Sequence, residues 1–171
     1  MNNLGDALKQ AGYSVPEAKK KVDSSRINLS SKIEACNEYL VSAYKAVDLI
    51  NELPNEKMTS MAIDSAVLNY QRYVEALKDI LTTICEKDGI QLSDNKSLSE
   101  VIRKSMCNIK VDSATESAIK MLTDRNDVVH DYMNSGYYDE QVIKHIINEY
   151  NRYKSYLKEV SNYCKRKGYI I

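Results

Sequence analysis

One short segment of the chain carries side chains that together could cleave a phosphodiester: Arg125, Asn126, His130 and Tyr132. On an α-helix, which turns by about 100° per residue, positions 126 and 130 share one face, and positions 125 and 132 share an adjacent one. Because imidazole has a pKa of about 6.5, His130 can accept and donate a proton close to neutral pH. An arginine can hold a phosphate through two hydrogen bonds and stabilise transition-state charge. The spacing therefore predicts a site for cleavage of RNA without a metal ion.

Each of these side chains has a role in that prediction. His130 would take the proton from a ribose 2′-OH or protonate the 5′-oxygen that leaves. Arg125 would bind the phosphate and lower the pKa of the histidine by like-charge repulsion, while Asn126 would orient the imidazole or bind the phosphate. One chain offers one histidine here, so two copies across a two-fold axis would supply both an acid and a base. The alternative is an exposed helix face, with Arg125 paired to an acidic residue and His130 half-buried.

The composition of the whole chain limits the kinds of protein it could be. Its 171 residues suit one domain, and only 5 are Gly and 2 are Pro. So few turn residues argue against an all-β fold, and no glycine-rich phosphate loop is present. The balance of 24 Lys+Arg with 24 Asp+Glu argues against nucleic-acid binding over the whole surface, although it allows a local basic site.

The cysteines and the hydropathy of the chain bear on its metal content and its compartment. Cys36, Cys85, Cys107 and Cys164 are too far apart for a metal knuckle. We expect no metal and no cofactor, with Cys36 and Cys85 acting as small core residues. The sequence shows neither a secretory signal nor an apolar run of the roughly 20 residues that span a bilayer. These features predict a cytoplasmic protein with reduced thiols and no membrane association.

The elements that must position the motif are helices, because apolar residues recur at spacings of three and four along most of the chain. We expect helices over about 29–53, 58–87, 97–107, 113–133 and 139–167. Short connections favour an antiparallel helical bundle of four to five helices, an all-α fold. Residues 1–27 are less regular and are predicted to form an accessory N-terminal arm, so that the bundle domain covers 28–171.

Local patterns predict where some helices begin and end. Ser97 with Glu100 forms an S-x-x-E capping box at the start of the short helix. Ser113 with Glu116 repeats that pattern ahead of the motif helix. Gly89 follows the second long helix at a position where glycine commonly ends helices.

Further residues on the last helix could contact a substrate. Tyr137 follows the motif closely enough to lie near the mouth of a cleft, and Lys154 and Lys158 lie among tyrosines that could stack bases. We predict these three residues to bind the substrate. The alternative for this helix is packing of its tyrosines against neighbouring helices, with the lysines solvated. His145 lies on the polar side of the apolar stripe and is predicted to be a surface or edge residue.

The R-N-x-x-x-H-x-Y motif at 125–132 resembles that of the HEPN superfamily. The similarity is closest to the HepT-like branch, which includes the nucleotidyltransferase substrate-binding proteins. Three further segments resemble that branch: 69–81, which ends in an L-K-D-x-L pattern, 97–103 and 121–126. The resemblance covers about 29–167, and the R-N-x-x-x-H-x-Y element is its specific part.

This resemblance implies a homodimeric helical bundle whose motif residues line a cleft shared by two copies. Arg125 and His130 would be the catalytic pair of a metal-independent endoribonuclease, with Asn126 as the supporting polar residue. The enzyme would be the toxin of a toxin–antitoxin or phage-defence system. Its antitoxin, a minimal nucleotidyltransferase, would silence it by transferring AMP to Tyr132. The alternative is a non-catalytic substrate-binding or partner subunit of that nucleotidyltransferase, modified by AMP on Tyr132.

Overall fold

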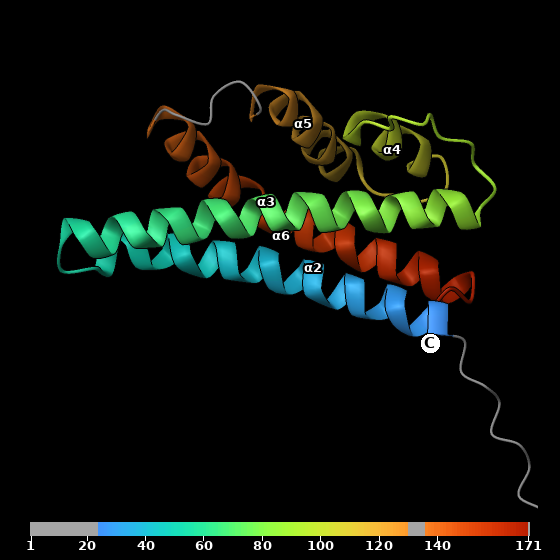
Figure 1. Ribbon diagram of the computed structural model, residues 1–171, viewed down its shortest axis with the longest axis horizontal. Coiled ribbons are helices and arrows are strands. Elements are labelled where there is room, and N and C mark those ends of the chain that lie inside the picture. The colour runs from blue at the N-terminus through green and yellow to red at the C-terminus, as the bar shows by residue number, and fades with distance from the viewer. Residues whose placement is uncertain (1–23, 130–135, 171) are drawn as a thin grey trace, which may run out of the picture.

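The computed structural model describes residues 24–129 and 136–170, with side chains over 28–50, 52–122 and 140–170. Every regular element in these residues is helical, which confirms the all-α prediction. In chain order they are α2 (Ser24–Leu49), the 3-10 turn η1 (Ile50–Glu52), α3 (Glu56–Lys87), α4 (Leu98–Ser105), α5 (Ser113–Val129) and α6 (Gly136–Arg166) (Figure 1). Residues 1–23, most of the expected N-terminal arm, lie outside the described residues, so the division at residue 27 stays a prediction.

A long antiparallel hairpin of α2 and α3 forms the base of the bundle (Figure 1). Lys32 Nζ lies 3.9 Å from Asp79 Oδ2, and the Arg72 guanidinium lies 5.9 Å from the centre of the Tyr39 ring. Residues early in α2 therefore meet residues late in α3. α6 packs against both helices, α4 packs against α3, and α5 packs against α4 and α6. None of the described helices combines the length and the apolar composition that crossing a bilayer requires.

The ends of the long helices follow from local chemistry. Leu53 adopts an extended conformation (φ −81°, ψ 138°), as expected for a residue that precedes a proline, and this ends η1. Asn55 then caps α3, because its side chain accepts a hydrogen bond from the Met58 amide at 3.0 Å. Gly89 has φ 72°, a left-handed conformation that favours glycine, and its predicted position after the second long helix is confirmed.

Of the two capping predictions, the one at Ser97 is confirmed in part. The Ser97 hydroxyl accepts from the Glu100 amide at 3.1 Å, as expected. The Glu100 carboxylate does not return to Ser97 but accepts from the Ser93 amide at 3.0 Å and pairs with Lys104 Nζ at 2.8 Å. Hydrogen bonds from Lys104 and Ser93 lower the pKa of Glu100 to about 2. The carboxylate therefore ties the loop before α4 to the helix.

The capping prediction at Ser113 is wrong by one residue. Asp112 Oδ1 accepts from the Thr115 amide at 2.9 Å, and Asp112 Oδ2 accepts from the Thr115 hydroxyl at 2.8 Å. Asp112 therefore caps α5, and Ser113 is the first residue of the helix. Thr115 is buried, so the cap also fixes the first turn of α5 against the bundle.

Tyrosine takes the place of phenylalanine and tryptophan in the bundle core. Tyr73, Tyr153 and Tyr156 are among its largest fully buried side chains. Cys36 and Cys85 are buried with them, which confirms the prediction for both. Burial raises the pKa of the Cys36 thiol to about 12, so this cysteine is protonated at neutral pH.

Replacing Tyr73 with phenylalanine should stabilise the protein by about 1 kcal/mol. Its hydroxyl is buried and has no hydrogen-bond partner among the described residues, and a buried unpaired polar group costs free energy. Urea unfolding measures the change as a higher midpoint with the same slope. Tyr163→Phe is the matched control, because the Tyr163 hydroxyl donates to Asp88 Oδ2 at 2.6 Å and its removal should destabilise by about 1 kcal/mol. A loss of stability in Tyr73→Phe would contradict the prediction.

Candidate functional site

The predicted site lies where α5 ends and α6 begins. The two helices pack against each other, and only residues 130–135 separate them in the chain. Figure 1 shows α5 running toward the side of the bundle at which α6 begins, and α6 running back from that side. The two helices therefore run antiparallel, and the last turns of α5 lie level with the first turns of α6.

Arg125 and Asn126 belong to the last two turns of α5. Earlier in the helix, Ala118 and Leu122 are buried. Position 125 follows position 118 by seven residues, and position 126 follows position 122 by four, so all four positions fall on one face of the helix. Positions 125 and 126 thus add a cationic and an amide residue to this face near the end that adjoins α6, beside the apolar Val129, which follows Leu122 by seven residues.

The predicted motif is covered by the structure only in its backbone at the end of α5. His130 and Tyr132 lie outside the described residues, as do the side chains of Arg125 and Asn126. Tyr137 is the second residue of α6, so its backbone lies level with the last turns of α5, and its side chain is also outside the description. The meeting of these side chains in one cleft therefore stays a prediction.

Lys154 and Lys158 lie far along α6 from the motif. Both side chains are exposed, and a rise of 1.5 Å per residue puts Lys154 roughly 25 Å beyond the first turn of the helix. Lys154 Nζ is 5.7 Å from the centre of the Tyr150 ring, which stacks on Tyr44 with 4.1 Å between ring centroids. Within one copy of the chain, only an RNA that follows α6 could reach both the motif and these lysines.

The tyrosines of α6 mostly serve the core. Tyr153, Tyr156 and Tyr163 are buried, so packing rather than base stacking is their role in this structure. Tyr150 is partly buried, its ring stacks on Tyr44 of α2, and Lys154 lies over the ring. Among the tyrosine side chains of α6 that the structure describes, Tyr150 is therefore the one that is not fully buried.

His145 is buried, which overturns the prediction of a surface residue. Its Nε2 is hydrogen-bonded to the Tyr153 hydroxyl, and the Tyr70 ring meets the imidazole edge-on with 5.9 Å between centroids. α6 packs against α2, α3 and α5, so the buried part of its circumference is wider than one stripe and includes position 145. The sequence signal that was missed is the spacing of eight residues from His145 to Tyr153, which places both on one face of α6.

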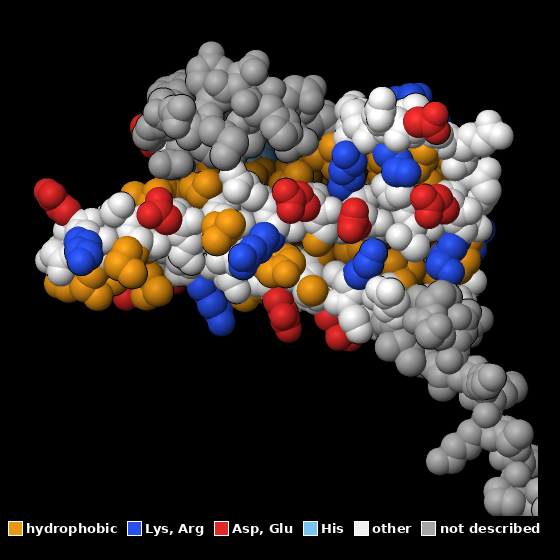
Figure 2. Space-filling view, viewed as in Figure 1, with side chains coloured by type: hydrophobic (Ala, Val, Ile, Leu, Met, Phe, Trp, Pro, Cys, Tyr) orange, Lys and Arg blue, Asp and Glu red, His pale blue; other side chains and the backbone are white. Residues whose placement is uncertain are grey.

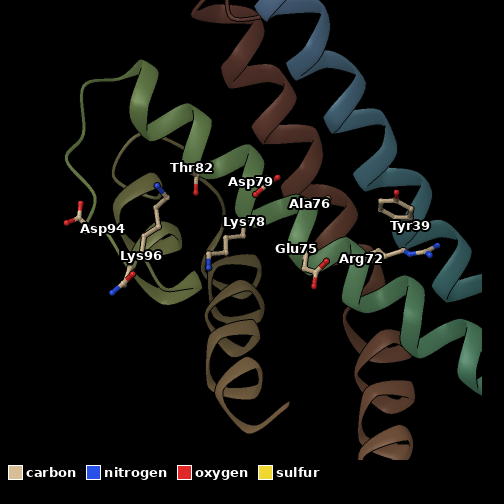
Figure 3. A pocket seen from close by; sticks show the side chains of 10 residues that line it. Tyr39, Arg72, Glu75, Ala76, Lys78, Asp79, Thr82, Asp94 and Lys96 are labelled. Carbon is tan, nitrogen blue, oxygen red and sulfur yellow. The ribbon is translucent and has the colours of Figure 1, made fainter. Parts of the chain in front are cut away.

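A groove on the outer face of α3 was also not apparent in the sequence (Figure 3). It has a volume of about 750 Å³ and extends from Tyr39 and Arg72 to the loop before α4. Three cationic side chains line it, Arg72, Lys78 and Lys96, together with three acidic ones, Glu75, Asp79 and Asp94. Because the two signs alternate and balance, the groove lacks the unopposed positive charge that favours a phosphate chain.

The position of Arg125 and Asn126 on the packed face of α5 is thus the strongest structural feature of the candidate site. Comparison with protein-family models, with curated proteins and with solved structures found no match to this chain. The functional argument therefore rests on the motif residues and on the packing of α5 against α6.

Proposed function

We propose that this protein is a metal-independent endoribonuclease of the HEPN type, with Arg125, Asn126 and His130 as its catalytic residues. The observation that carries the proposal is the position of Arg125 and Asn126 on the packed face of α5. Arg125 and Asn126 continue the face on which Ala118 and Leu122 are buried, next to the start of α6. A cationic and an amide residue on the packed face of a helix, beside a helix junction, suit a polar cleft better than a solvated surface.

The reaction would be a transesterification within the RNA chain. The base removes the proton of a ribose 2′-OH, whose oxygen attacks the neighbouring phosphorus. The bond from phosphorus to the 5′-oxygen breaks, and the acid protonates that oxygen as it leaves. The products are a 2′,3′-cyclic phosphate and a free 5′-hydroxyl. Arg125 would stabilise the additional negative charge on the phosphate oxygens in the transition state.

Two copies of the chain would build the complete site. Apolar surface on the two helices that flank the motif supports such a dimer. Met121 of α5 and Ile147 of α6 are exposed, and Ile143 is only partly buried. A two-fold axis at this surface would bring two α5–α6 pairs together, and each shared cleft would then have two histidines and two arginines.

The decisive test is incubation of a mixed RNA with the purified protein in EDTA, after intact mass has shown that Tyr132 is unmodified. We expect cleavage to continue in EDTA, because the mechanism needs no metal, and to leave 2′,3′-cyclic phosphate ends that mass spectrometry can identify. Cleavage only with added metal, or 3′-hydroxyl products, would contradict the mechanism. No cleavage by the unmodified protein would favour the non-catalytic partner role.

The proposed regulation predicts a specific chemical change on Tyr132. With ATP and a minimal nucleotidyltransferase encoded beside this chain, the protein should gain the mass of one or more AMP units and lose its nuclease activity. Tyr132→Phe should block the mass gain and keep cleavage, whereas the neighbouring Tyr137→Phe should still be modified. Modification of both variants alike would exclude Tyr132 as the acceptor.

A further inference from the structure

Exposed apolar side chains gather from the tip of the α2–α3 hairpin along the first half of α3. Leu49, Met58, Met61 and Leu68, here called the hairpin patch, each leave between 44% and 63% of their surface exposed. They make up four of the six large hydrophobic residues that are exposed in the described part of the chain. Figure 2 shows hydrophobic side chains grouped over this end of the molecule. Isolated exposed apolar residues are ordinary, but a group of them on one feature marks a docking surface.

The patch is exposed because the turn of the hairpin projects beyond the helices that pack on it. The turn between α2 and α3 projects past α4, α5 and α6 (Figure 1). Among the described elements, η1 packs against α2 and α3. Met58, Met61 and Leu68 follow one another at spacings of three and seven on α3, so they form a single stripe. A stripe of this kind is the complement of another helix that lies along it.

A hollow beside the patch gives the tip a concave surface. It has a volume of about 420 Å³ and is lined in part by Leu53, Pro54 and Ile63. Glu56 and Asp64 also line it. Apolar walls with acidic side chains among them suit an occupant that is apolar on one side and cationic at its edges.

The charges around the tip specify the occupant further. Asp48, Glu52, Glu56 and Asp64 are exposed, and none of them forms an ion pair within the described residues. Two exposed lysines, Lys45 and Lys57, oppose these four carboxylates. The tip is therefore net negative, although the whole chain is neutral. Flexible methionines beside unpaired acidic groups favour a helix with an apolar face and basic flanks.

We propose that the tip of the α2–α3 hairpin is a docking site for a basic amphipathic helix of a partner protein. The helix would lay its apolar side chains on the hairpin patch and pair its lysines or arginines with the four acidic residues at the tip. This surface is separate from the proposed ribonuclease site at the α5–α6 junction. Partner binding can therefore fail or succeed independently of RNA cleavage.

The test uses the full chain, with its methionine methyl groups labelled with ¹³C, and a synthetic peptide. The peptide contains leucines at i, i+3, i+4 and i+7 and lysines elsewhere. In NMR titration, the methyl signals of Met58 and Met61 should shift and saturate, while that of Met121 on α5 should not. A peptide with the same leucines and with glutamates in place of lysines should bind at least about tenfold more weakly, because charge decides the fit.

Matched charge variants separate a local site from general attraction. Glu52→Lys with Glu56→Lys should weaken peptide binding by about tenfold. Glu34→Lys with Glu38→Lys makes the same charge change at exposed positions elsewhere on α2 and should leave binding unchanged. Unmoved Met58 and Met61 signals at millimolar peptide, or equal losses in both double variants, would overturn the proposal. So would self-association that Met61→Glu abolishes and that excludes the peptide, since the occupant would then be a second copy.

Discussion

His130→Ala is expected to slow RNA cleavage by roughly 10²- to 10⁴-fold, the usual contribution of a general acid or base. An alanine can neither remove the 2′-OH proton nor protonate the leaving oxygen. The measurement is the initial rate of cleavage in EDTA, with wild type and variant at matched concentration. Circular dichroism and the thermal midpoint should be the same for both, so that the loss belongs to the chemistry. A variant that cleaves at the wild-type rate would remove His130 from the mechanism.

Substitutions of Arg125 should lower the rate of RNA cleavage in a graded way. Arg125→Ala removes the phosphate-binding charge and is expected to lower the rate by roughly 10²- to 10³-fold. Arg125→Lys keeps the charge but loses the two-pronged hydrogen bond, so its rate should fall between those of wild type and alanine. Arg103→Ala is the matched control, because Arg103 is exposed on α4, and it should cleave normally. Equal losses at positions 103 and 125 would indicate general attraction for RNA rather than catalysis.

Much of the helical framework could be read from the chain because its signals are local. Apolar stripes mark the two long helices of the hairpin, and Gly89 follows the end of the second. The error at the start of α5 is also local. Asp112 with Thr115 and Ser113 with Glu116 are both plausible caps one residue apart, and the sequence alone does not decide between them.

Features that depend on how the helices pack could not be read in the same way. His145 was predicted to lie at the surface because one apolar stripe was assumed for α6. In the structure α6 packs against three helices, and His145 is buried. The hairpin patch arises because α2 and α3 extend beyond their neighbours, a property of the assembled bundle. Residue types alone suggested the motif, but the continuity of Arg125 and Asn126 with the packed face of α5 became visible only with the helix in place.

Asp88→Ala is expected to lower the free energy of unfolding by about 3 kcal/mol, because one carboxylate joins three parts of the fold. The Asp88 side chain at the end of α3 is only 3% exposed. It accepts hydrogen bonds from Tyr163 at 2.6 Å, Tyr169 at 2.7 Å and Asn108 at 2.9 Å. Removal of the carboxylate would leave these donors without their acceptor and release the C-terminal end of α6 from α3. Urea unfolding at neutral pH measures the loss.

The same carboxylate should make the stability depend on pH in a defined range. Burial alone would raise the pKa of Asp88, but hydrogen bonds from Tyr163, Tyr169 and Asn108, together with the charge of Lys167, lower it from its usual 3.8. A lowered pKa in the folded state contributes stability that is complete above about pH 5 and is lost as the pH falls through the folded-state pKa.

Asp88→Asn isolates this contribution, because it keeps the shape and removes the charge. The difference in unfolding free energy between wild type and Asp88→Asn should be constant above about pH 5 and should shrink as the pH falls below about 4. Asp79→Ala is the control, since that carboxylate is exposed with only a 3.9 Å pairing to Lys32, and its effect should stay within about 0.5 kcal/mol. A difference for Asp88→Asn that does not change between pH 7 and pH 3 would mean that shape, rather than the buried charge, joins α3 to the end of α6.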